Sequence, residues 1–219
     1  MRGLLSTRAR SAGDTMPTVS AVVLAGGRST RLQQDKALLE LDGQWVLESI
    51  LHKLAFLSDD VLVVGGDRVK LRPLGVPIVP DARPGAGPLG GIYSGLKRMR
   101  HERGLFVACD MPLLNLSLLR YMIELSPEFD VVIPRIGDNV EPLHAIYSKM
   151  CLLPMEEHLN RGERRVVCFH ASVRMRYVEE SEILSFDPQH LSFFNINTPQ
   201  DLQMARQIHQ KQRPTGKVD

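Results

Sequence analysis

Cysteine, charge imbalance and long apolar runs are all scarce in this sequence of 219 residues. The three cysteines, Cys109, Cys151 and Cys168, lie far apart and form no C-x-x-C pair, which favours free thiols in a reducing compartment over a disulfide framework or a structural zinc site. With 27 basic and 25 acidic residues the net charge is only +2, so charge gives no argument for binding nucleic acid or a membrane surface. No apolar stretch approaches the roughly 18 residues that cross a bilayer. We therefore expect a cytoplasmic protein with no nucleic-acid and no membrane partner.

The first 17 residues differ in composition from the rest of the chain. They carry three arginines, have Asp14 as their one acid, and lack the apolar core of a signal peptide. An organellar transit peptide is one interpretation, and a disordered tail, or an upstream start codon ahead of Met16, is the one we prefer. Because no repeat or linker follows, we expect a single domain over residues 18–210 and a polar tail over residues 211–219.

Short apolar runs alternate with segments of helical periodicity from residue 19 onward. The run 19–24 ends in glycines, which is typical of a buried strand. Thr198, Pro199 and Asp201 predict a final helix that reaches about His209, because they combine an N-cap, a proline at the first helical position and an acid three residues after the cap. Further strands are expected at 61–64, 76–79, 105–109, 130–133 and 144–147, and further helices at 45–54, 89–99, 117–125 and 149–159.

This alternation predicts an α/β protein with a three-layer, Rossmann-like fold. Strands separated by helices form βαβ units, so the sheet is expected to be mostly parallel and covered by helices on both faces. In such sheets the ligand lies at the carboxyl ends of the strands, where the loops gather.

Two glycines follow the first predicted strand in the run Leu24-Ala25-Gly26-Gly27. Adjacent glycines let the backbone approach a ligand closely and turn its N–H groups toward an anion. Arg28, Arg31 and Lys36 add three positive charges within nine residues. The loop is not a Walker A motif, since no Gly-Lys-Ser/Thr follows at the required spacing. The sequence thus favours a phosphate site over a plain tight turn with solvated basic residues.

A second glycine run, Gly85 to Gly90, matches the G-x-G-x-x-G pattern, and Asp110 lies twenty residues beyond it. That outline is typical of a dinucleotide-binding fingerprint. However, residues 80–84 separate the run from its strand, and a glycine turn already follows the first strand. We therefore interpret the run as a turn that opens the helix beginning near Leu89.

Two acids, Asp81 and Asp110, each follow a predicted strand. A carboxylate at the carboxyl edge of a parallel sheet is well placed to bind Mg²⁺ beside phosphates, although a single such acid is also common as a cap. Together with the basic glycine loop they predict a metal–triphosphate site. His144 has no paired acid or nucleophile and is interpreted as a packed strand residue, and the other histidines show no zinc-ligand spacing.

Several motifs in one order resemble the MobA-like molybdenum cofactor guanylyltransferases, nucleotidyltransferases whose fold is similar to that of nucleotide-diphospho-sugar transferases. The resemblance covers roughly residues 19–206. It is carried by LAGGRSTRLQQDKALLELDG, PDARPGAGPLGGI, VACDMPLL, EPLHAIY, RGERRV and FFNINTPQDL.

The resemblance implies that GMP is transferred from GTP to molybdenum-molybdopterin, which yields the guanine dinucleotide cofactor and pyrophosphate with the help of Mg²⁺. It also implies molybdenum-insertion proteins and acceptor molybdoenzymes as partners. Carried onto this chain, the catalytic residues are Arg31, Lys36 and Asp110, with Asp110 binding the metal. The nucleotide-binding residues are Leu24, Ala25, Gly26, Gly27, Lys36, Asp81 and Asp110, and the pterin side is lined by Arg164, Arg165, Asn195 and Asn197.

The chain departs from the family pattern at Gln33, where glycine is common, and within residues 64–67, where an asparagine is common. Two alternatives stay open for that reason. One is a cytidylyl or sugar-phosphate nucleotidyltransferase of the same fold, and the other is a non-catalytic module that binds GTP or the pterin.

Overall fold

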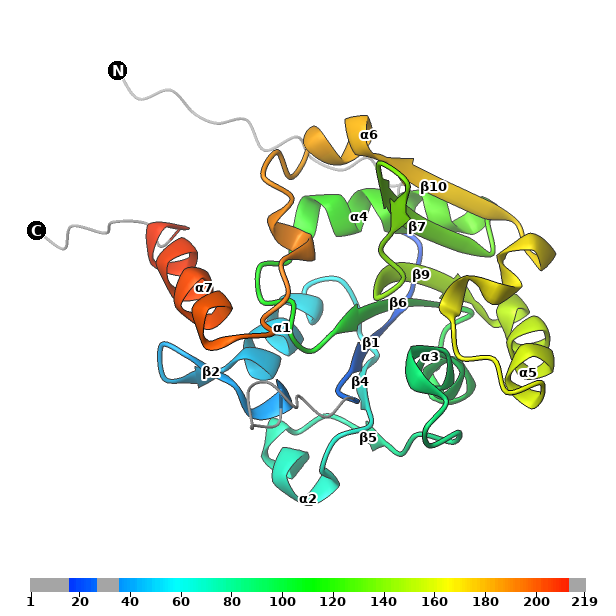
Figure 1. The fold of residues 1–219 in the computed structure, drawn as a ribbon, viewed down its shortest axis with the longest axis horizontal. Helices are drawn as coiled ribbons and strands as arrows, with labels where there is room; N and C mark the ends of the chain where they lie inside the picture. The colour runs from blue at the N-terminus through cyan, green and yellow to red at the C-terminus, as the bar shows by residue number, and fades with distance from the viewer. Residues whose placement is uncertain (1–15, 27–35, 213–219) are drawn as a thin grey trace, which may run out of the picture.

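The computed structural model describes residues 16–26 and 36–212, which fold around one central β-sheet (Figure 1). The order of its strands is β10-β7-β9-β6-β1-β4-β5, and β8 pairs with β7. The strands are β1 (Ser20–Leu24), β4 (Val61–Val64), β5 (Ile78–Val79), β6 (Arg103–Ala108), β7 (Val131–Ile136), β8 (Asn139–Val140), β9 (His144–Ser148) and β10 (Met175–Glu179). A separate two-stranded sheet pairs β2 (Glu40–Leu41) with β3 (Gln44–Trp45).

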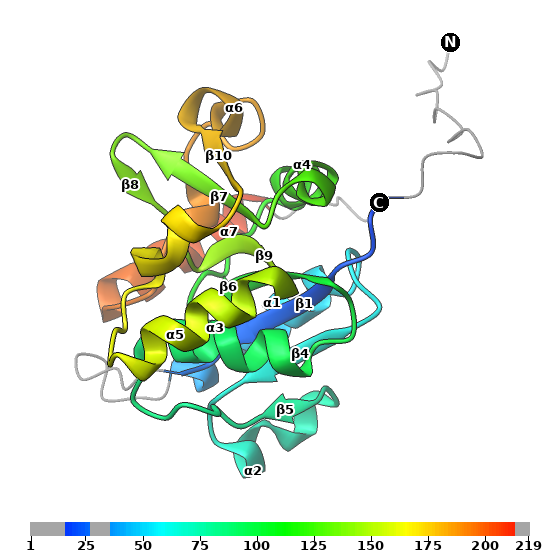
Figure 2. The same cartoon turned by 90° about the vertical axis from the view of Figure 1, so that its right-hand side faces the viewer.

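Helices cover both faces of this sheet (Figures 1 and 2). One face packs against α1, α4 and α6, the other packs against α3 and α5, and α7 lies to the side against β2. The three-layer α/β architecture is therefore confirmed. The helices are α1 (Val46–Leu54), α2 (Arg68–Leu71), α3 (Gly87–Arg98), α4 (Leu116–Leu125), α5 (Leu152–Asn160), α6 (Glu180–Leu184) and α7 (Pro199–Gln212). None of the helices in the described ranges has both the length and the apolar composition that a bilayer crossing requires.

Strand β1 lies at the centre of the sheet because all five of its residues are apolar or small and can be buried on both sides. It pairs in parallel with β4 on one side and with β6 on the other. Its side chains alternate between the two cores, so that Val23 joins the α1 side and Val22 joins the α3 side.

Strand β9 runs antiparallel to both of its neighbours, β6 and β7. The sheet therefore consists of parallel strands on either side of β9, and the short strand β8 also pairs antiparallel with β7. The edge strand β10 was not predicted, since Arg176 interrupts its apolar pattern and Val178 is its one buried residue. The predicted strand over 76–79 is shorter than expected and begins at Ile78.

The final helix begins as the sequence predicted. Asp201 Oδ2 accepts hydrogen bonds from the backbone nitrogens of Asn197 and Thr198 at 2.9 and 2.8 Å, and Thr198 Oγ1 accepts one from the Asp201 nitrogen at 3.1 Å. These reciprocal bonds satisfy N–H groups that the first turn of α7 leaves unpaired. They also fix the residues just before the helix.

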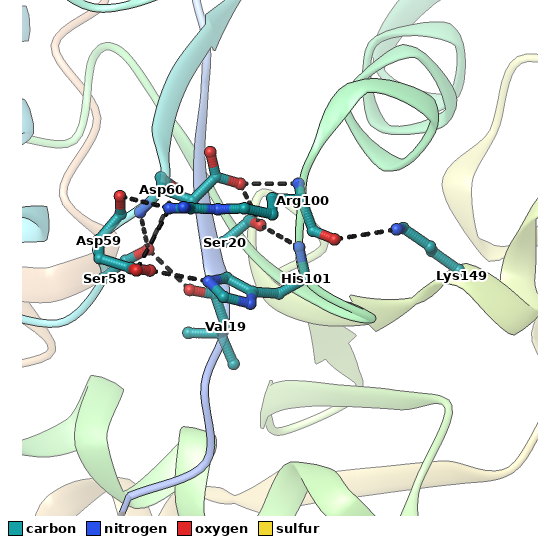
Figure 3. Close-up of polar contacts among 8 residues, drawn as sticks. All are labelled: Val19, Ser20, Ser58, Asp59, Asp60, Arg100, His101 and Lys149. Carbon is teal, nitrogen blue, oxygen red and sulfur yellow. Dashed lines mark hydrogen bonds and ion pairs between the residues drawn. The ribbon is translucent and has the colours of Figure 1, made fainter.

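A polar network ties the amino ends of the central strands together (Figure 3). Asp60, which precedes β4, accepts hydrogen bonds from the Ser20 hydroxyl and from the Arg100 backbone nitrogen. His101 Nε2 lies 2.7 Å from Asp59 Oδ1, and this hydrogen bond lowers the pKa of Asp59. The network lies at the amino edge of the sheet, so it leaves the carboxyl edge open to a ligand.

Candidate active site

A cavity of about 510 Å³ opens at the carboxyl ends of β1, β4 and β6. This is where a parallel α/β sheet is expected to bind its ligand. Five of the predicted site residues line it. The lining is Leu24, Gly26, Lys36, Val64, Gly65, Asp81, Gly85, Gly87, Pro88, Gly91, Ala108, Cys109, Asp110 and Leu143.

The first glycine loop begins at the carboxyl end of β1, where Leu24 and Gly26 line the cavity. The Ala25 nitrogen donates to Val64 O at 2.9 Å, and the Leu24 carbonyl accepts from the Cys109 nitrogen at 3.1 Å, which fixes the end of the strand on both sides. Ala25 is buried, whereas Gly26 is exposed to the cavity. Gly27 and Arg31, the other predicted residues of this loop, lie outside the described residues.

A second glycine turn, Gly65-Gly66, packs directly against the first. Both residues have positive φ, +81° and +74°. A Cβ at Gly65 would lie 3.3 Å from the Gly26 nitrogen, and one at Gly66 would lie 2.6 Å from a methyl carbon of Leu71. The positive φ values and these close contacts favour glycine at both positions, and Gly65 forms part of the cavity wall.

Lys36 and Asp110 contact each other just beyond the carboxyl end of β6. Lys36 Nζ lies 2.6 Å from Asp110 Oδ2 and donates to Asn197 Oδ1 at 2.6 Å. The Ile196 nitrogen donates to the Asp110 carbonyl at 2.9 Å, which holds the segment before α7 against the end of β6. The structure thus unites three predicted residues that are as much as 161 positions apart in sequence.

Asp81 occupies the opposite wall of the cavity, and its position is set by Ser94 of α3. Asp81 Oδ1 accepts hydrogen bonds from the Arg83 nitrogen and the Ser94 hydroxyl, both at 2.9 Å. Ser94 is 1% exposed and its oxygen also accepts from the Ala82 nitrogen at 2.9 Å. Sequence reasoning missed Ser94 as a positioning residue; its one sequence signal is a polar residue on the buried side of a helix.

The run Gly85 to Gly90 forms the turn that opens α3, as expected. The helix begins at Gly87 with Pro88 in its first turn, and Gly85 and Gly87 have φ values of +81° and +66°. Both glycines line the cavity, so the positive end of a twelve-residue helix lies at its rim. An anion is stabilised at such a position.

The predicted pterin-side residues are spread more widely. Arg164 and Arg165 are exposed, and the Arg164 backbone lies 3.8 Å from the position that a Cβ on Gly87 would take. Arg164 lines a neighbouring depression of about 330 Å³ on the α5 side of the glycine turn. The Asn195 amide donates to Phe193 O at 3.0 Å, so among these residues it is Asn197 that reaches Lys36.

His144 is packed inside the core, as the sequence indicated. It is 0% exposed, its ring meets that of Phe193 edge-on at 4.9 Å, and burial lowers its pKa to about 4. A neutral, enclosed imidazole at neutral pH has no access to the cavity solvent, which excludes it as a general base for a ligand there.

The fold and this site define an enzyme of the nucleotidyltransferase class, with a cation, a carboxylate and three glycine turns at the carboxyl edge of the sheet. Residues 21–174 match the family model for the MobA-like NTP transferase domain. The chain belongs to this family.

Relatives of this family cover almost the whole chain. A protein of Pelotomaculum thermopropionicum named probable molybdenum cofactor guanylyltransferase is 39% identical over 203 residues, which are 93% of this chain and 98% of the relative. A molybdenum cofactor guanylyltransferase of Syntrophotalea carbinolica is 37% identical over 85% of this chain and 90% of its own.

Solved structures show the same fold. The molybdopterin-guanine dinucleotide biosynthesis protein A of Archaeoglobus fulgidus superposes with a TM-score of 0.77 at 27% identity, over 88% of this chain and all of its own. The 2-C-methyl-D-erythritol 4-phosphate cytidylyltransferase of Thermus thermophilus reaches 0.65 at 18% identity, over 88% and 99% of the two chains, a likeness of fold alone.

Proposed function

We propose that this protein transfers GMP from GTP to molybdenum-molybdopterin and so forms the guanine dinucleotide cofactor and pyrophosphate. The observation that carries the proposal is the pair of Lys36 and Asp110 beside glycine-rich backbone in one cavity, with Asn197 hydrogen-bonded to Lys36. Relatives at 37–39% identity over most of the chain carry the matching name.

The reaction needs no nucleophile from the protein. A terminal phosphate oxygen of the acceptor attacks the α-phosphorus of GTP, a new P–O bond forms, the bond between the α- and β-phosphates breaks, and pyrophosphate leaves. Catalysis then consists of positioning and charge stabilisation. Lys36 supplies positive charge for the departing phosphates, and Asn197 and Asp110 hold its ammonium group in place. The start of α3 and Gly26 supply backbone N–H groups.

Mg²⁺ is the cofactor that we propose for this site. Asp110 lies on the cavity wall with 11% of its side chain exposed, so its carboxylate is within reach of a ligand. Mg²⁺ binds oxygen and needs one or two carboxylates plus substrate phosphates, which fits Asp110. Asp81 lines the same cavity, where its Oδ1 accepts hydrogen bonds from Ser94 and Arg83, and we assign it to the nucleotide and not to the metal. When bound, Mg²⁺ would neutralise charge on the triphosphate.

We assign the remaining roles by the same reasoning. Leu24, Ala25, Gly26, Gly27 and Asp81 would bind the nucleotide, and Arg31 would contact its triphosphate. The exposed Arg164 and Arg165, with Asn195 and Asn197, would face the pterin. We further propose that the protein acts in the cytoplasm as a single domain over residues 18–210, together with molybdenum-insertion proteins and acceptor molybdoenzymes.

A nucleotide panel tests the proposal. The purified protein is incubated with Mg²⁺, molybdenum-molybdopterin and one of GTP, CTP, ATP or UTP, and both pyrophosphate and the dinucleotide product are measured. GTP is expected to give the fastest release. Faster release with CTP would favour a cytidylyltransferase, and GTP binding without any pyrophosphate would favour a non-catalytic module.

A further inference from the structure

Three metal-ligating side chains meet on the α5 side of the molecule, outside the lining of the main cavity. His158 belongs to α5, Glu163 to the loop after it, and Cys168 to the 3-10 segment Val166–Ser172. Their donor atoms, a ring nitrogen, a carboxylate oxygen and Sγ, all lie within 4.8 Å of one another. Within the ranges that the structure describes, no other three such side chains come together in this way.

We propose that His158, Glu163 and Cys168 bind one Zn²⁺ ion. A nitrogen, an oxygen and a sulfur are the three donor types that zinc takes in proteins, and three protein ligands leave a fourth tetrahedral position for water. The thiolate and the imidazole favour zinc over Mg²⁺, which prefers oxygen. The site is therefore chemically distinct from the one at Asp110.

The geometry is close to what the ion requires. Zinc–ligand bonds of about 2.0–2.3 Å place tetrahedral donor atoms roughly 3.3–3.8 Å apart. His158 Nδ1 and Glu163 Oε1 are already 3.0 Å apart. The Glu163 side chain is 44% exposed and the His158 side chain 17%, so the glutamate has room to turn while the imidazole stays in place. The donors reach coordination distance by side-chain rotation.

The positive charge of the zinc ion is also balanced by the negative charges of its ligands. Zn²⁺ with one thiolate and one carboxylate forms a neutral unit, so the exposed Arg161, Arg164 and Arg165 nearby do not repel the complex as they would a bare cation. Without the metal, Glu163 pairs with His158 and its carboxylate also interacts with the Cys168 thiol, whose pKa is raised by burial and by this carboxylate. The ion would replace that exposed pair with bonds to three segments at once.

Bound zinc would brace the loop that carries Arg164. The ligands lie on both sides of Arg164 and Arg165 in sequence, and the Arg164 backbone oxygen lies 3.8 Å from the position that a Cβ on Gly87, at the rim of the main cavity, would take. Fixing this loop restricts the freedom of two exposed arginines beside the site. The metal site itself does not depend on GMP transfer, so it is tested by binding.

The first experiment measures metal content and ligand type. Untagged protein is dialysed against Zn²⁺ alone or Co²⁺ alone; we expect one metal per chain and a thiolate-to-cobalt charge-transfer absorption. His158→Gln, Glu163→Gln and Cys168→Ser should each lower the affinity for zinc at least tenfold. His101→Gln is the matched control, because His101 also contacts a carboxylate, Asp59, at 2.7 Å, without a thiol. Thermal unfolding shows that each variant is folded.

The second experiment uses the unaltered chain. Zn²⁺ should protect Cys168 from alkylation by N-ethylmaleimide, mapped by mass spectrometry, whereas Mg²⁺ should not. Three results would overturn the proposal: wild-type protein that gives no cobalt–thiolate absorption, alkylation of Cys168 that zinc leaves unchanged, or zinc affinity in Cys168→Ser equal to that of the wild type. None of these results bears on pyrophosphate release.

Discussion

Lys36 illustrates how single residues are positioned at this site. Its ammonium group contacts two oxygen acceptors at 2.6 Å, one at the end of β6 and one just before α7. Its side chain is 21% exposed, so its charge is screened less than that of a surface lysine. A cation held in this way needs little reorganisation when a triphosphate enters, which is the condition under which a charge contributes most to catalysis.

Replacement of Lys36 by alanine should lower kcat by about a hundredfold or more, since loss of one preorganised charge contact costs on the order of 3 kcal/mol. Asp110→Asn should have an effect of similar size. The measurement is steady-state pyrophosphate release. Lys70→Ala is the control, because Lys70 also pairs with an aspartate, Asp67, but on an exposed helix. A Lys36 variant as active as the Lys70 variant would contradict the assigned role.

His144 predicts how stability depends on pH. Burial lowers its pKa to about 4, whereas a histidine in an unfolded chain titrates near 6.5. Between these values the unfolded chain binds a proton that the folded chain does not, so folding is fully supported above pH 6.5 and loses free energy as pH falls toward 4. The contribution of this residue is up to about 3 kcal/mol.

Urea unfolding of the wild type and of His144→Leu at pH 7.5 and pH 5 tests this expectation. The variant should show a smaller loss of unfolding free energy between the two pH values. His52→Leu serves as control, because His52 is exposed on α1. Equal pH dependence in the wild type and His144→Leu would show that this histidine is not the source.

At the scale of elements, α3 connects the site to the sheet. It begins at the cavity rim with Gly87, carries Ser94 against Asp81, and lies close on β1 and β6 through Gly95. A Cβ at Gly95 would lie 2.6 Å from a ring carbon of Phe106 and 2.9 Å from a methyl carbon of Val22. Because interiors are close-packed, the helix cannot shift outward without moving Ser94 as well.

Gly95→Ala should therefore destabilise the protein by about 1–3 kcal/mol through overpacking, despite the better helix propensity of alanine. Gly91→Ala is a matched change in the same helix, where the nearest contact of the new methyl would be an ordinary 3.4 Å to Leu24. It should be neutral or stabilising by up to about 1 kcal/mol. Chemical denaturation measures both, and an unchanged midpoint for Gly95→Ala would count against the close contact.

At the scale of the whole molecule, the sequence predicted those strands and helices whose position depends on a local pattern of apolar and polar residues. The central strands β1, β4 and β6 were found because burial on both faces demands continuous apolar runs. The edge strands β8 and β10 were missed because half-exposed strands tolerate polar residues. The reversed direction of β9 depends on pairing between distant segments, which no local pattern encodes.

The residues of the candidate site fall into the same two groups: those that a local pattern predicts, and those that depend on contacts between distant segments. Asp81 and Asp110 could be placed at strand ends from sequence alone, because parallel strands bring their carboxyl ends to one edge. The family's motifs marked Lys36 as a triphosphate residue and Asn197 as a pterin-side residue, but their contact joins residues 161 positions apart and was not predicted. The support of Asp81 by Ser94 is a contact between side chains and became visible only in three dimensions.

Ligand binding should stabilise the whole chain, because the cavity is built from segments across the fold. GTP with Mg²⁺ at about a hundred times its dissociation constant should raise the free energy of unfolding by about 2.7 kcal/mol. Thermal or urea unfolding with and without GTP measures this, with Lys36→Ala expected to show a smaller gain. No stabilisation at saturating GTP would argue against the cavity as the nucleotide site.

The contact of Lys36 with Asn197 has a consequence for how the protein is made. Asn197 is translated 161 residues after Lys36, when every strand in the described part of the chain has already been made. Strands β1, β4 and β6 and the glycine turns at Gly65 and Gly85 are all translated before this second acceptor. The contact between Lys36 and Asn197 can therefore form only after these strands have been translated, and a chain that stops before residue 197 lacks the second acceptor for the lysine.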